Sequence, residues 1–203
     1  QRGLRVGAPL LARLGDIETL IHQHGQWVLD KLAAWHERSV TEKPTLTTGT
    51  VIFALDSPLT VTITPGSRQR WLFSDDKLHL FVPPTVTARV VLEKALREKA
   101  RTIFSQRLAH YAQALGVTTP PLRLSSARTR WGSCSHHGGI SLNWRLVFMP
   151  LAVIDYVVAH ELAHLREMNH SPRFWSVVEQ LCPDWRARRL ELRQLGRQIP
   201  QFQ

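Results

Sequence analysis

The chain has 203 residues, 43% of them hydrophobic, which is enough for one sizeable core or two small ones. Its formal net charge of +10 favours polyanionic partners without identifying one, and its two cysteines do not suggest a disulfide framework. No apolar run is long enough to span a membrane, and no Walker loop, dinucleotide fingerprint or zinc-finger spacing is present.

The first part of the chain predicts a small unit of helices and short strands. A strand-like pattern ends at residues 4–6, and Asp16 can cap a helix that runs to about residue 37. A polar, linker-like stretch covers residues 42–50. Four short strand candidates, separated by turn residues, follow at 51–54, 59–63, 70–73 and 77–82.

A long helix is predicted from residue 86 to residue 115, where Gly116 closes it. We therefore divide the chain into three parts. Residues 1–85 form an N-terminal unit with short strands, residues 86–116 form the connecting helix, and residues 117–203 form a catalytic unit. Together these elements predict an α+β fold.

The catalytic unit opens with two predicted strands, 122–133 and 140–148, on either side of a hairpin loop at 135–139. Alternate residues of the second strand are apolar, so they share one face. An edge strand can bind an extended substrate through its backbone, and we assign that role to residues 140–148. The other face carries Ser141, Asn143 and Arg145, which are either substrate contacts or ordinary surface residues.

The next predicted helix contains H-E-x-x-H within an apolar stretch, at residues 160–164. His160 and His164 are four residues apart, so both imidazoles lie on one helix face and can grip one metal ion. Glu161 directly follows the first histidine, where it could take a proton from water at the metal. A solvent-facing amphipathic helix is the ordinary alternative, but the apolar flanks indicate burial, and buried histidines need partners. The pattern is typical of metallopeptidases, with Zn2+ as the usual metal.

Catalytic zinc sites use three protein ligands, and the chain offers three candidates for the third. Glu167 would lie on the same helix as the first two ligands, which suits a tetrahedral site poorly. Glu179 lies in the following predicted helix. His170 precedes Ser171 and Pro172, a typical helix N-cap and first helical residue, so the turn before them can bring it back to the metal. We favour His170 and keep Glu179 as the alternative.

Three motifs resemble those of a known family: R-W-G-S-C at 130–134, S-L-N-W-R-L at 141–146, and the stretch from H-E-L-A-H to F-W at 160–175. Over nearly its whole length the chain resembles the YgjP-like family of bacterial predicted metal-dependent hydrolases, grouped near the SprT and WLM metallopeptidases. The resemblance implies a zincin-like catalytic unit, metal ligands at His160, His164 and His170, and a catalytic glutamate at Glu161. Members are usually described as metallopeptidases, and some as UTP pyrophosphatases.

Hydrolysis at such a site develops negative charge that needs a donor. Tyr156 lies one helical turn before His160, and Arg145 and Arg130 are alternatives, although each is more often a structural residue. The densest group of basic residues lies in a predicted terminal helix, where a solvated helix face is the default interpretation. Its members are Arg186, Arg188, Arg189, Arg193 and Arg197.

Three functions follow from this reasoning. The leading one is a zinc metallopeptidase acting on extended polypeptide, with Glu161 as general base. The second uses the same metal on a nucleoside triphosphate such as UTP. The third is a non-catalytic zinc-stabilised binding module, against which the presence of Glu161 argues.

We also expect a cytoplasmic location, no membrane partner and polyanion contact through the basic surface. The oligomeric state is left open. The chain begins at Gln1 in mid-pattern, so we expect a few residues to precede it.

Overall fold

The computed structural model describes residues 12–26, 29 and 45–199. Contacts group the chain into residues 1–44 and residues 45–203, and the three-part division at 85 and 116 stays a prediction. Helix α1 (Leu14–Gln23) begins two residues before the predicted start at Asp16. The strand end predicted at 4–6, the predicted helix beyond residue 29 and the start of the predicted linker lie outside the described residues.

The first sheet contains the four predicted strands in the order β1-β2-β4-β3. β1 and β2 pair antiparallel, β2 and β4 pair parallel, and β3 pairs antiparallel with β4. Three strands have the predicted bounds, and β2 is two residues longer at each end. The bounds are β1 (Val51–Ala54), β2 (Ser57–Pro65), β3 (Arg70–Phe73) and β4 (Lys77–Val82). Alternate residues of β1, β2 and β4 are buried, so one face of the sheet packs into the core.

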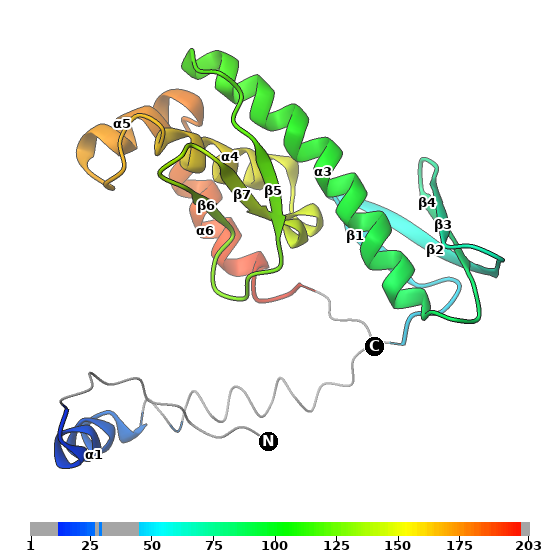
Figure 1. The fold of residues 1–203 in the computed structure, drawn as a ribbon, viewed down its shortest axis with the longest axis horizontal. Coiled ribbons are helices and arrows are strands. Elements are labelled where there is room, and N and C mark those ends of the chain that lie inside the picture. Colours follow the sequence, from blue (N-terminus) through cyan, green and yellow to red (C-terminus); the bar gives the residue numbers. More distant parts are fainter. Residues whose placement is uncertain (1–11, 27–28, 30–44, 200–203) are drawn as a thin grey trace. The chain divides into compact units, whose positions relative to one another are not determined.

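Helix α3 (Ala88–Leu115) passes between the first sheet and the helices of the C-terminal half (Figure 1). Its buried residues recur every three to four positions, which gives it one continuous apolar face. These residues are Val91, Leu92, Ala95, Leu96, Ala100, Phe104, Leu108 and Ala112. Gly116 adopts φ 68, and its backbone N–H donates hydrogen bonds to the carbonyl oxygens of Ala112 and Gln113. The helix therefore ends where the sequence predicts.

The second sheet differs from the predicted pair of long strands. In place of the predicted strand 122–133 there are two separate strands, β5 (Leu122–Ser125) and β6 (Gly132–Cys134), joined by a loop. β7 (Ile140–Asn143) is the central strand of the order β5-β7-β6, parallel to β5 and antiparallel to β6. The prediction that residues 140–148 form an edge strand is therefore wrong.

Asn143 explains why the strand ends early. Its side-chain Oδ1 accepts a hydrogen bond from the backbone N–H of Arg145 (3.1 Å), which starts the 3-10 helix η1 (Trp144–Phe148). Its Nδ2 donates to the carbonyl oxygens of Ala127 (2.8 Å) and Arg130 (3.2 Å). The apolar alternation that suggested a strand also suits η1, because Trp144 and Leu146 are buried there.

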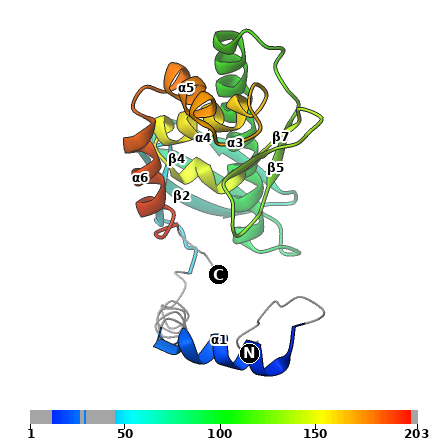
Figure 2. The ribbon, with the colours of Figure 1, turned by 90° about the vertical axis from the view of Figure 1, so that its left-hand side faces the viewer.

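Three helices complete the fold: α4 (Leu151–Ala163), α5 (Pro172–Leu181) and α6 (Trp185–Leu195). Arg107 of α3 forms a bidentate ion pair with Asp155 of α4, at 2.6 and 2.8 Å, which fixes α4 against α3. α6 lies alongside α4 (Figure 2). The predicted α+β class is confirmed. Among the described residues, no helix has both the length and the apolarity needed to cross a bilayer.

Candidate metal centre

Three histidines converge where α4 ends and the chain turns into α5. Each of His160, His164 and His170 offers one ring nitrogen, and these atoms all lie within 4.8 Å of one another. The Nε2 atoms of His160 and His170 are 3.2 Å apart. The turn before α5 brings His170 back as predicted, because the Ser171 side chain accepts a hydrogen bond from the Phe174 N–H (3.4 Å) and Pro172 begins the helix.

Neighbouring groups hold the three rings in place. Nδ1 of His164 lies 3.3 Å from the carbonyl oxygen of Glu167, which leaves Nε2 of that ring for a ligand. The fully buried ring of Phe174 lies 4.6–4.9 Å from all three imidazole centres. The histidine cluster therefore lies at the C-terminal end of α4, and the ring of Phe174 packs against it.

The surroundings of His160 and His164 favour their neutral forms, as metal binding requires. Burial, together with the electrostatic effects of His164, His170 and Arg189, lowers the pKa of His160 to about 3. Burial also lowers the pKa of His164. Three imidazoles whose ring nitrogens all lie within 4.8 Å of one another fit a bound cation.

Glu161 is buried beside this cluster, with 5% of its surface exposed. Burial raises the pKa of its carboxyl group to about 7, the range in which a general base works best near neutral pH. The carboxyl group lies against the backbone of β6. A Cβ added to Gly132 would lie 2.7 Å from both Cγ and Cδ of Glu161, so only glycine leaves room for this side chain.

The comparison with known families agrees with this geometry. The family model of the YgjP-like metallopeptidase domain matches residues 1–195. The chain belongs to this family. No curated protein matches the chain.

Two solved structures are similar to this YgjP-like chain. The metallopeptidase zymogen abylysin of Pyrococcus abyssi is 27% identical, with a TM-score of 0.42 over 49% of this chain and 99% of that one. The metallopeptidase zymogen jannalysin of Methanocaldococcus jannaschii is 15% identical, with a TM-score of 0.38 over 43% of this chain and 94% of that one.

The other predicted site residues lie in different environments in this YgjP-like chain. Tyr156 is buried on α4 with its ring 6.0 Å from the His160 ring, so it stays close to the centre. The side-chain hydrogen bonds of Asn143 go to the backbone, which is a structural role. Arg145 lies over the ring of Trp144 at 4.7 Å, and Arg130 is exposed.

The alternative third ligand, Glu179, lies outside the histidine cluster. Its carboxylate binds Arg186 at 2.8 Å, and half of the side chain is exposed. Sequence reasoning missed two residues that lie beside the centre, Gly132 and Trp175. Both belong to motifs that carried the family resemblance, R-W-G-S-C and F-W, but neither carries a group that a search for ligands or bases would select.

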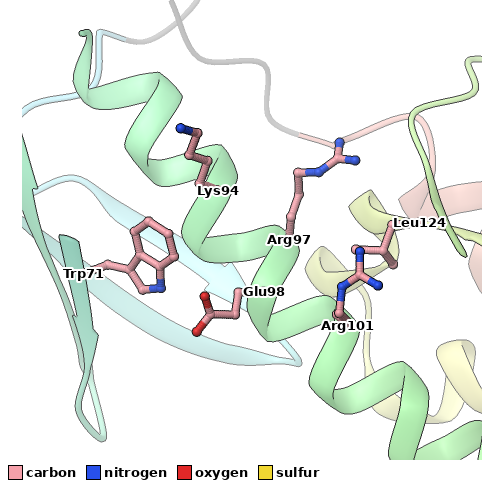
Figure 3. Close-up of a pocket in the computed structure, with 6 residues that line it drawn as sticks. All are labelled: Trp71, Lys94, Arg97, Glu98, Arg101 and Leu124. Atoms are coloured by element: carbon pink, nitrogen blue, oxygen red, sulfur yellow. The ribbon is translucent and has the colours of Figure 1, made fainter. Parts of the chain in front are cut away.

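A separate hollow lies along α3, away from the histidines (Figure 3). It has a volume of about 370 Å³ and adjoins a second one of about 320 Å³ that shares Lys94 and Arg97. Acidic side chains accompany its basic ones, as in the 3.3 Å contact between Glu93 and Arg97. This mixed surface contains no residue of the metal centre.

Proposed function

We propose that this YgjP-like chain is a zinc-dependent peptidase that hydrolyses extended polypeptide. The observation that carries the proposal is the convergence of three histidines next to a buried glutamate. Three imidazoles form a ligand set typical of catalytic zinc, and they leave a coordination position open for the reaction. A structural zinc site is usually closed by a fourth protein ligand and has no need of an adjacent base, so a binding module is the weaker interpretation.

Different residues of the chain would carry out different steps of the reaction. Zinc, when bound by the three histidines, supplies Lewis acidity that polarises a carbonyl group and makes water a better acid. Glu161 accepts a proton from the attacking water and later passes it to the leaving amine. Without metal, burial raises the pKa of its carboxyl group to about 7, and its contact with the backbone of β6 limits where the carboxyl group lies. Tyr156 is the nearest of the proposed donors for the negative charge that develops.

The edge strand β6 is the proposed docking site for substrate, in place of residues 140–148. Its Gly132 lies against the base, and among the described residues β6 pairs with a strand, β7, on one side only. Adding the substrate as another strand would bind its backbone without demanding a particular sequence. Such pairing requires a locally unfolded substrate.

The experiment measures zinc content and hydrolysis in the same preparations. His170→Ala should lower the zinc content, whereas Glu179→Ala should keep it, since Glu179 binds Arg186 instead. Glu161→Gln should keep zinc and lose at least about 10²-fold in hydrolysis of an unfolded, labelled polypeptide. Loss of zinc in Glu179→Ala alone would remove His170 from the site.

The same wild-type protein should be tested on UTP. Release of pyrophosphate, abolished by Glu161→Gln and without any polypeptide cleavage, would contradict the peptidase proposal. Cleavage of polypeptide with no action on UTP supports it.

A further inference from the structure

The arginines of α6 differ in their ion pairing. Arg186 and Arg188 each bind nearby acidic side chains at 2.6–2.8 Å. Arg189 and Arg193 are exposed, and neither takes part in an ion pair within the described part of the chain. Because they lie four residues apart, both are on the same face of the helix. This face therefore carries two positive charges without acidic partners.

That face of α6 lies next to the metal centre. Cζ of Arg189 is 5.3 Å from the centre of the Trp175 ring, and that ring is 5.8 Å from the His160 ring. Adding the two distances puts the guanidinium at most about 11 Å from the His160 ring centre. Both arginine charges also act on the buried hydroxyl of Tyr156, where they oppose the rise in pKa caused by burial.

We infer that Arg189 and Arg193 bind a carboxylate of the substrate close to the bond that is cleaved. The inference rests on the proposed peptidase function. Guanidinium groups match carboxylates in shape and charge, and contact with an aromatic ring holds Arg189 ready for binding. An extended chain advances about 3.3 Å per residue, so a reach of 11 Å corresponds to roughly three residues from the scissile bond.

A single carboxylate fits this surface better than a polyanion does. Polyanion-binding surfaces spread many unpaired basic residues along a face or stripe. Here the neighbouring Arg186 and Arg188 are already bound by acidic side chains, so among the described residues of this segment the unpaired charge is limited to Arg189, Arg193 and, just past the end of α6, Arg197. The carboxylate can come from an acidic side chain or from the C-terminus of the substrate.

The test uses one neutral fluorogenic peptide sequence and versions with a single aspartate one to three residues from the cleaved bond. Each version is made with a free and with an amidated C-terminus. We expect the zinc-loaded wild type to cleave at least one carboxylate-bearing version about tenfold better in kcat/KM, mainly through KM. The double variant Arg189→Gln/Arg193→Gln should lose this preference. Arg186→Gln is the matched control and should keep the preference.

The two sources of the carboxylate give different results. A preference that disappears on amidation identifies the C-terminus, and one that survives it identifies an acidic side chain. Equal cleavage of all peptides by the wild type, or an unchanged preference in the double variant, would overturn the inference.

A binding measurement separates this inference from the proposed function. If no peptide is cleaved, zinc-loaded Glu161→Gln is titrated with the same peptides while tryptophan fluorescence is followed. Tighter binding of carboxylate-bearing peptides, lost when both arginines are replaced, supports the subsite even though the peptidase proposal fails. Equal binding of charged and neutral peptides overturns it.

Discussion

Replacing Gly132 with alanine tests whether the Glu161 carboxyl group must lie against β6. The added Cβ would lie 2.7 Å from Cγ and Cδ of Glu161, whereas carbon atoms pack at about 3.5–4.0 Å. The carboxyl group would therefore have to move by about 1 Å. The backbone of Gly132 has no positive φ, so alanine is tolerated there and the side-chain clash is the main effect.

We expect this change to lower kcat by about 10²-fold, the usual effect of a 1 Å misplacement at a reacting centre. Zinc content should stay the same, because the three atoms nearest to the new methyl group all belong to Glu161. The assay follows cleavage of a labelled, unfolded polypeptide, with elemental analysis of the same sample.

Two further variants make the result specific. Gly139→Ala is the control in the neighbouring loop, where the new Cβ meets the movable Ser135 hydroxyl at 3.3 Å and activity should change little. Adding Gly132→Ala to Glu161→Gln should cause no further loss if both changes act on the same proton transfer. Full activity of the single variant Gly132→Ala would refute the reasoning.

Two predictions concern stability. Asp155→Asn leaves Arg107 without its ionic partner and should cost about 1–3 kcal/mol of unfolding free energy in urea titrations, whereas Glu179→Gln at the surface should cost less than about 1 kcal/mol. In the metal-free protein, the pKa of His160 is about 3 when folded and 6.5 when unfolded, so His160 gains a proton on unfolding at a pH below 6.5. The pKa of Glu161 is about 7 when folded and 4.5 when unfolded, so Glu161 loses a proton on unfolding at a pH above 4.5. Between pH 4.5 and 6.5, His160 makes the unfolding free energy rise with pH and Glu161 makes it fall. Glu161→Gln removes the second effect. The unfolding free energy of this metal-free variant should therefore rise more steeply with pH than that of the wild type, by up to about 1.4 kcal/mol per pH unit. Parallel pH profiles would contradict this.

The sequence predicts the convergence of the three histidines because they are close together in the chain. The spacing of His160 and His164 is set by helix geometry alone. The position of His170 follows from a helix-capping signal that the structure confirms, since Ser171 caps α5 and Pro172 follows it. The roles proposed for these residues in binding zinc and in catalysis stay predictions.

The second sheet was harder to predict because its strands depend on side-chain hydrogen bonds between distant segments. Asn143 ends β7 by capping η1 and also binds the loop that leads to β6. Alternating apolar residues cannot distinguish this arrangement from one long strand, since both bury Trp144 and Leu146. The contact between Gly132 and Glu161 joins two elements that no local pattern connects.

The short stretch that contains the three histidines has a consequence for the order of folding. A metal ion that joins residues 160 and 170 closes a small loop, and closing a small loop costs little chain entropy. In the proposed zinc peptidase, the ion could therefore bind before the sheets have formed. The base is different, because its surroundings include β6, which the chain must bring in from a distant segment. In the proposed zinc peptidase, metal binding and peptidase activity would therefore be acquired separately during folding.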